Sequence, residues 1–329
     1  MNAMVTSASE KRVFFVGVNT GYVTDGLPDE RFVRFYALRS SPRLHCAIVG
    51  NVVIPDGYGS NNVSPAIRAA PIWSEIASAI KSRGSVPGIQ LASAWSGYQG
   101  AKSFRSPSGK TVISEARELV KTFGPREIAN LFRRLDEATD LALEAGFQHI
   151  QLHAAHGYLF NLLIDGRIFD GAEDVICRIG DWASSAKMGG VESSIRVSLR
   201  SGDDEFDKVG TAEFQSNISK NIPVDLIDVS SGFYNIDKRL IYPARPAILE
   251  SRRNETIELA LLFPERRFIA SGRVASMDTD KLPTNVDIGL CRDLIANPDF
   301  LNDKHRGCTN RGKCHYYSRG EPHITCGNW

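Results

Sequence analysis

The sequence predicts a single (β/α)₈ barrel, and three observations support this fold class. Short β-branched segments recur along the 329 residues, and helix-like sequence follows them. Eight such segments are nearly continuous in apolar residues, which is typical of parallel strands covered on both faces. A chain of this length is also normal for a barrel, which folds as one unit well beyond about 200 residues.

The expected strands alternate with helices, which is compatible with a barrel or with a doubly wound sheet. No G-x-G-x-x-G follows the first strand, where a dinucleotide-binding sheet requires it, so eight strands favour the barrel. We expect strands at Val13–Val18, Cys46–Val53, Gly88–Ala92, His149–His153, Ile195–Leu199, Asp225–Val229, Arg267–Ala270 and Asp287–Leu290.

Two of the helices between these strands have clear boundaries. Pro125–Ala145 begins with proline, carries one apolar stripe and precedes Gly146. Pro71–Arg83 has the same plan and precedes Gly84. About thirty residues separate the third strand from Pro125, and they include Ser103–Lys110, rich in Ser, Pro and Gly. This insertion predicts a lid or binding loop at the carboxyl ends of the strands.

Composition excludes several kinds of partner. The net charge of +1 and the pI of about 7.6 provide no basic surface for nucleic acid. The apolar runs are far shorter than the roughly 20 residues that span a membrane, and the polar first dozen residues lack a secretion signal. We therefore expect a cytoplasmic protein that acts on a small molecule, with homo-oligomer formation left open.

The segment Ala145–Asn161, AGFQHIQLHAAHGYLFN, carries the titratable side chains best placed for chemistry. His153, His156 and Tyr158 follow a strand, so they lie at the mouth of the barrel. Residues three apart on a regular strand point to opposite faces, so the histidines converge only if the chain turns at Ala154–Ala155. The alternative is that one histidine caps a helix and the other is satisfied in the core.

The run HAAHGYL after AGF resembles the motif of bacterial relatives of the Old Yellow Enzyme family, and the similarity extends from about Arg12 to Asn297. The resemblance implies FMN as cofactor and NAD(P)H as hydride donor. It also implies that His153 and His156 bind the activating group of the substrate, that His153 contacts FMN, and that Tyr158 is the proton donor.

Other segments match the flavin-binding pattern of that family in the same order. Gln90 is implied to bind the pyrimidine edge of the flavin, and Arg196 to lie beside N1 and O2, where a cation stabilises the anionic reduced flavin. Turns after strands seven and eight are implied to bind phosphate, with Arg292 as a bidentate charge. The other implied cofactor contacts are Gly17, Val18, Asn19, Gly50, Ser231, Gly232, Ser271, Gly272, Arg273 and Cys291.

Some positions differ from the family pattern. Asn19 replaces a cysteine or threonine, Ser93 a frequent histidine, Trp95 a basic residue and Cys291 a glycine, and Gly166–Gly171 is a shortened loop. These changes surround the substrate and phosphate ends of the expected site. The resemblance therefore does not identify the substrate.

The tail, residues 301–329, is expected as a segment separate from the FMN-binding barrel of residues 1–300. Cys308, Cys314 and Cys326 resemble the iron–sulfur segment of longer relatives such as 2,4-dienoyl-CoA reductase, with Arg311 at the place of the second cysteine. A cubane cluster usually needs four thiolates, so we expect neither an iron–sulfur cluster nor another metal.

Together these features predict an FMN-dependent NAD(P)H oxidoreductase, similar to ene reductases, that reduces the activated C=C bond of an α,β-unsaturated carbonyl or related compound. Two alternatives stay open. One is a flavin-binding barrel with lost or altered catalysis. The other is a metal-dependent barrel hydrolase that uses His153 and His156 as ligands, although their motif contains no carboxylate.

Overall fold

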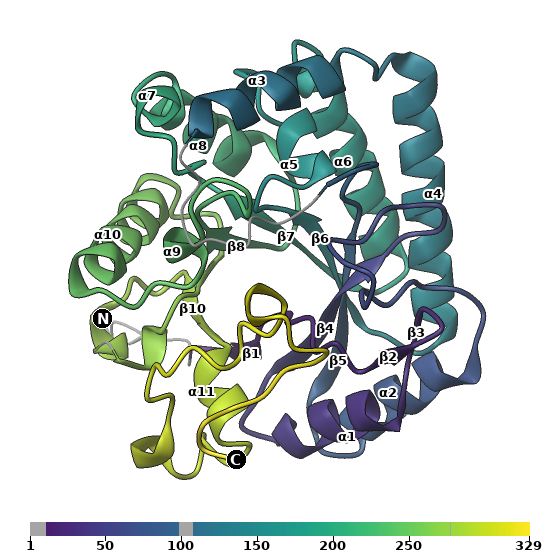
Figure 1. Cartoon of the computed structure of the whole chain (residues 1–329), viewed down its shortest axis with the longest axis vertical. Coiled ribbons are helices and arrows are strands. Elements are labelled where there is room, and N and C mark those ends of the chain that lie inside the picture. Colours follow the sequence, from purple (N-terminus) through teal and green to yellow (C-terminus); the bar gives the residue numbers. More distant parts are fainter. Residues whose placement is uncertain (1–10, 99–107, 277) are drawn as a thin grey trace, which may run out of the picture.

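The barrel is present in the computed structural model, which describes residues 11–98, 108–276 and 278–329. Its strands are β1 (Val13–Phe15), β4 (Cys46–Val53), β5 (Val86–Ala92), β6 (His149–Ala154), β7 (Glu192–Ser198), β8 (Leu226–Ser230), β9 (Phe268–Ala270) and β10 (Val286–Leu290). They are parallel and close in the order β1-β10-β9-β8-β7-β6-β5-β4 (Figure 1). The predicted fold class is confirmed.

Helices surround the barrel on its outer side (Figure 1). They are α1 (Glu30–Arg39), α2 (Pro71–Lys81), α3 (Gly109–Val120), α4 (Pro125–Glu144), α5 (Leu159–Leu163), α6 (Ala172–Met188), α7 (Asp204–Asp207), α8 (Thr211–Asn221), α9 (Lys238–Ile241), α10 (Pro246–Leu262) and α11 (Arg292–Ala296). Short 3₁₀ turns and a hairpin complete the described elements: η1 (Val274–Ser276), η2 (Thr279–Lys281), η3 (Lys304–Arg306), η4 (Tyr317–Arg319), β2 (Val23–Thr24) and β3 (Leu27–Pro28).

The two helices with clear sequence boundaries form as predicted. Pro71 and Pro125 occupy the first turns of α2 and α4, where a missing N–H costs no hydrogen bond. Both helices end before a glycine with positive φ, +87° at Gly84 and +93° at Gly146. These are conformations that glycine adopts without steric cost, so each glycine ends its helix.

The first and fifth predicted strands differ at their ends. β1 stops at Phe15, because Val18 leaves the ladder and forms an antiparallel bridge with Gly50. β7 begins at Glu192, before the apolar run that predicted it. Its buried Ser193 hydrogen-bonds Asp225 and its buried Ser194 contacts Gln151, so polar residues stand where a sequence pattern would recognise apolar ones.

The predicted lid lies partly outside the described residues. Of Ser103–Lys110, residues 103–107 are not described, and the rest belongs to the start of α3. Ser108 is the N-cap of that helix and accepts a hydrogen bond from the Thr111 backbone N–H. Within the described ranges, none of the helices is both long and apolar enough to cross a membrane.

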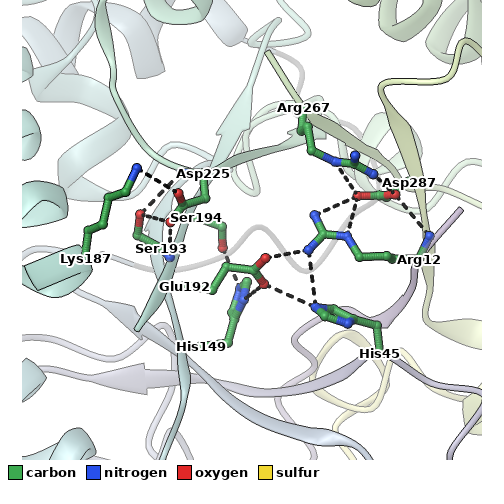
Figure 2. A network of polar contacts seen from close by, with 10 residues as sticks. All are labelled: Arg12, His45, His149, Lys187, Glu192, Ser193, Ser194, Asp225, Arg267 and Asp287. Carbon is green, nitrogen blue, oxygen red and sulfur yellow. Dashed lines mark hydrogen bonds and ion pairs between the residues drawn. The ribbon is translucent and has the colours of Figure 1, made fainter. Parts of the chain in front are cut away.

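An ion-pair network occupies the amino-terminal end of the barrel (Figure 2). Arg12, before β1, donates to Glu192 at 2.5 Å and pairs with Asp287 at 3.0 Å. Arg267 pairs with the other oxygen of Asp287 at 2.7 Å, and His149 contacts Glu192 at 2.8 Å. Burial alone raises the pKa of Glu192, but hydrogen bonds from its histidine partners and the charge of Arg12 outweigh it and lower that pKa.

Candidate active site

A cavity lies at the carboxyl ends of the strands, the face on which barrel enzymes build their sites. It contains about 1080 Å³ of space between atoms, counting the part open to solvent. Most predicted site residues line it: Gly17, Val18, Asn19, Gln90, His153, His156, Tyr158, Arg196, Ser271, Gly272, Arg273, Cys291 and Arg292. The fold therefore gathers at one cavity residues that are far apart in the sequence.

A tight turn after β6 brings His153, His156 and Tyr158 together. His156 has a φ of +63° and Gly157 a φ of +77°, so the chain reverses directly after the strand. The backbone N–H of His156 donates to Ser198 Oγ at 2.9 Å, which holds the turn against β7. The His153 ring lies 5.1 Å from the His156 ring and 4.6 Å from the Tyr158 ring, between centroids. The two histidines therefore converge, because the chain turns after the strand as their spacing requires.

Both histidines are buried beside a cation. Burial, together with the charge of Arg196, places the pKa of His153 well below its usual value. Burial, His153 and Arg196 act in the same direction on the pKa of His156. His156 Nε2 lies 2.7 Å from Ser230 Oγ, whereas His153 Nδ1 is buried without a hydrogen-bond partner among the described residues. The pair is therefore neutral near pH 7, and one nitrogen is left for a ligand.

Tyr158 stands beside the histidines with its hydroxyl held in place. Asn51 Nδ2 donates to the hydroxyl oxygen at 2.9 Å, and the Tyr98 ring packs at 5.2 Å, edge to face. Burial raises the pKa of Tyr158, so the phenol remains protonated at neutral pH. Asn51 occupies the oxygen as a donor, and the Ser60 side chain is a second hydrogen-bond partner of the same hydroxyl.

Gln90 and Arg196 form the polar floor of the cavity. Gln90 Nε2 donates to Gln151 Oε1 at 2.5 Å, so its carbonyl oxygen is the end left for a ligand. That oxygen lies where a Cβ on residue 17 would come within 3.1 Å, and Gly17 leaves the space open. Arg196 Nη1 donates to Asp228 Oδ2 at 2.5 Å, which orients the guanidinium on β7.

Further arginines line the opposite part of the cavity. Gly272 turns with a φ of +96°, and a Cβ there would meet Pro243 at 3.0 Å, so the turn after β9 requires glycine. Arg292 donates to the Pro243 carbonyl and, at 3.0 Å, to Asn310 of the tail. Among the lining residues that the structure describes there is no Asp or Glu, so Arg273 and Arg292 give the cavity a positive charge, whereas Arg196 is paired with Asp228 beneath it. Such a cavity suits a phosphate.

Three predicted cofactor contacts do not line the cavity. Gly50 donates its N–H to the Tyr36 hydroxyl at 3.3 Å, behind the wall. Ser231 and Gly232 are in the loop after β8, where a Cβ on residue 232 would come within 2.6 Å of the Asp237 carbonyl oxygen. These residues shape the strand ends, and their contact with a cofactor stays a prediction.

Other lining residues carried no recognisable signal in the sequence. Tyr234 and Tyr242 follow β8, and their hydroxyls lie 2.7 Å apart. From the tail come Cys314, His315, Tyr316 and Tyr317. The His315 ring packs on Tyr242 with centroids 4.0 Å apart. Aromatic residues are common in loops, so their presence in the sequence does not indicate a site. Only their contacts in the folded protein show that these residues line the cavity.

The cysteine tail packs on the barrel. Its Tyr316 and Ile324 belong to the main hydrophobic core, and the tail, yellow in Figure 1, reaches the mouth of the barrel. Cys308, Cys314 and Cys326 are free thiols that line a small pocket next to Arg292. Within the described part of the chain, no group of three or more His, Cys, Asp or Glu has a metal-binding arrangement. The division at residue 300 stays a prediction.

Fold and site together define a (β/α)₈-barrel protein with a positively charged ligand site at its carboxyl-terminal mouth. Residues 15–170 match the NADH:flavin oxidoreductase / NADH oxidase family. The chain is 24% identical over 330 residues to an NADH-dependent flavin oxidoreductase of Aspergillus parasiticus, covering 86% of this chain and 70% of that one. These matches confirm the resemblance to the Old Yellow Enzyme family, and that similarity implies FMN as cofactor and NAD(P)H as electron donor.

Other relatives are longer than this chain. 12-oxophytodienoate reductase 7 of Oryza sativa subsp. japonica is 27% identical over 171 residues, 45% of this chain and 41% of the relative. The fold is similar to 6-hydroxypseudooxynicotine amine oxidase from Pseudomonas geniculata N1 (TM-score 0.72, 15% identity, 96% of this chain, 51% of that one). It is also similar to histamine dehydrogenase from Rhizobium sp. 4-9 (TM-score 0.68, 17% identity, 96% of this chain, 50% of that one). The chain thus spans about half the length of these proteins or less.

Proposed function

We propose that this protein is an FMN-dependent NAD(P)H oxidoreductase that reduces the activated C=C bond of an α,β-unsaturated carbonyl or a related compound. The observation that carries the proposal is the convergence of His153, His156 and Tyr158 over a cavity floored by Gln90 and Arg196. Two neutral imidazoles and a protonated phenol meet the needs of carbonyl activation and proton donation.

The residues present fit FMN. The free carbonyl oxygen of Gln90 and the guanidinium of Arg196 suit the pyrimidine edge of a flavin, which offers an N–H donor and carbonyl acceptors. The turn at Gly272, with Arg273 and Arg292, suits one phosphate group. When bound, FMN supplies the two-electron chemistry by which hydride passes from NAD(P)H to the β carbon of the substrate.

The protein side chains then have separate tasks. His153 and His156 donate N–H groups to the carbonyl oxygen and draw electron density from the C=C bond. Ser230 acts on His156, because a hydroxyl that donates to Nε2 leaves the ring proton on the other nitrogen. Tyr158 delivers a proton to the α carbon, and Asn51 keeps its hydroxyl oriented.

The absorbance spectrum of purified protein is the first test. A flavin spectrum excludes a metal-dependent hydrolase, and oxidation of NADPH by the yellow protein with an enone excludes an inert flavin-binding barrel. Mass spectrometry of the released cofactor should find FMN, because only one phosphate-sized turn is evident. Recovery of FAD, or of no flavin from fresh protein, would contradict the proposal.

Ligand binding tests the histidine pair. Titration with p-hydroxybenzaldehyde should give a charge-transfer band in the wild-type protein. We expect His153→Ala with His156→Ala to lose that band and keep FMN, because the phenolic oxygen loses its donors. Undiminished phenol binding in the double variant would remove the two histidines from the substrate site.

A further inference from the structure

A buried polar pair, Gln151 and Asp228, lies beneath the cavity without lining it. Both side chains are fully buried, on β6 and β8. Gln151 accepts from Gln90 at 2.5 Å and donates to Asp228 Oδ2 at 3.4 Å. The same Oδ2 accepts from Arg196 at 2.5 Å. One hydrogen-bonded unit therefore holds both side chains that form the polar floor.

The charge of Asp228 needs a reason, because a buried carboxylate is costly unless it is paired. Its charged partner is Arg196, which binds Oδ2. The other oxygen, Oδ1, has no hydrogen-bond partner among the described residues. The guanidinium also reaches Ser230 Oγ at 3.4 Å, so it has a neutral contact besides the carboxylate. The pair carries no net charge, and the positive field of Arg196 in the cavity is reduced accordingly.

We propose that Asp228 is a positioning residue that orients Arg196 and offsets its charge, so that bound FMN has a lower reduction potential than Arg196 alone would set. This inference rests on the proposed function, in which Arg196 faces the flavin. Reduction adds negative charge to the flavin, and a nearby cation favours the reduced form. A carboxylate paired with that cation opposes the effect, and Gln151 keeps the carboxylate in register.

The test is the midpoint potential of the FMN-loaded protein, measured by equilibration with a reference dye. Asp228→Asn keeps the size of the side chain and an oxygen acceptor for Arg196, but removes the charge. We expect the potential to become more positive, so that the ratio of the dissociation constants of oxidised and reduced FMN rises on the order of tenfold. Asp228→Ser is a second neutral variant and should shift the potential in the same direction.

Asp287→Asn is the matched control. Asp287 is also a fully buried carboxylate paired with arginine, but it lies in the network at the amino-terminal end of the barrel (Figure 2). The Asp287→Asn variant should be less stable than the wild-type protein, and its bound FMN should keep the wild-type midpoint potential. An unchanged or more negative potential in the Asp228 variants would overturn the inference. Failure of both Asp228 variants to fold, with Asp287→Asn folded, would show a purely structural role and overturn it as well.

The two proposals fail in different ways. Wild-type protein that binds no FMN contradicts the proposed function before any variant is made. Wild-type protein that binds FMN, together with Asp228 variants that bind it at an unchanged potential, contradicts only the role of Asp228.

Discussion

His153, His156 and Tyr158 show how burial sets the chemistry of single residues. Ordinary values would leave a histidine partly charged at neutral pH. Here burial and Arg196 favour the neutral imidazoles, and burial keeps the phenol of Tyr158 protonated. All three side chains are thus hydrogen-bond donors without charge. That combination suits a neutral carbonyl better than a cationic ligand.

Tyr158→Phe should separate the two half-reactions. Flavin reduction by NADPH should be unchanged, because hydride transfer needs no side-chain acid. Reoxidation by an enone should slow by roughly 10²–10⁴-fold, since the α carbon then takes its proton from water. Stopped-flow absorbance resolves the two steps, and quinones, whose products take protons from solvent, serve as the control substrate. Equal losses in both steps, or none, would show that Tyr158 is not the acid.

The buried histidines should make stability depend on pH. Below about pH 6.5 the unfolded chain binds protons that folded His153 and His156, with lowered pKa values, do not. The stability tied to their neutral forms is complete above that pH and is lost as the pH falls toward the folded pKa values.

Replacing both with Gln should therefore flatten the loss of unfolding free energy between pH 6.5 and 5.5, by up to about 1.4 kcal/mol per pH unit for each histidine. Urea denaturation at each pH measures it. His305→Gln, at an exposed position, is the control and should keep the wild-type slope. Parallel curves for the double variant and the wild type would contradict the lowered pKa values.

At the scale of elements, the two ends of the strands have different tasks. The carboxyl ends carry the cavity, whereas the amino ends of β1, β7 and β10 are joined by the network around Arg12 (Figure 2). β1 has only the short ladder Val13–Phe15, so side-chain pairs that link it to β7 and β10 add to the closure of the barrel. Polar residues at this end serve stability, as is usual in barrels.

Asp287→Asn should lower the free energy of unfolding by about 3 kcal/mol, because it leaves Arg12 and Arg267 without their shared buried carboxylate. The arginine side chains are 25% and 35% exposed, which keeps the loss at the lower end for a broken buried pair. Lys187→Met removes a pair whose lysine is 75% exposed, and it should cost less than about 1 kcal/mol. If chemical denaturation shows that the two variants lose equal free energies of unfolding, the difference expected between the buried and the exposed pair is contradicted.

For the whole molecule, the tail completes the wall of the site. Residues that follow the last strand by more than twenty positions contact the loops after β8 and β1, so the cavity is closed by the end of the chain. The same packing leaves Cys314 and Cys291 half-buried. Burial raises the pKa of Cys314 to about 11 and that of Cys291 to about 12. Thiolates, which metals and electrophiles require, are therefore scarce there.

Alkylation with iodoacetamide at pH 8 should reflect this burial. Cys177 is exposed and should react at least about 100 times faster than Cys291 and Cys314, whose thiolate fractions are roughly one in a thousand or less. Peptide mass spectrometry follows each site over time. Protein unfolded in guanidinium is the control, and there the rates should converge. Similar rates in the folded protein would contradict the packing of the tail.

The sequence by itself determined the order of the barrel elements and predicted most of the residues that line the cavity. Apolar runs, Pro at helix starts and Gly at helix ends are local signals, and they located eight strands to within a few residues. The histidines and Tyr158 lie in one short segment, so a motif could reveal them. β7 was the least complete prediction, because Ser193 and Ser194, both buried, interrupt the apolar pattern.

Only the tertiary structure decided which distant residues share the cavity. It placed Tyr242 and His315 in the wall, left Gly50 outside it, and paired Asp228 with Arg196. Each of these facts depends on a contact between segments that are far apart in the chain. Local periodicity carries no information on such contacts, because they arise when the strands close into a barrel and bring loop, tail and strand ends to one mouth.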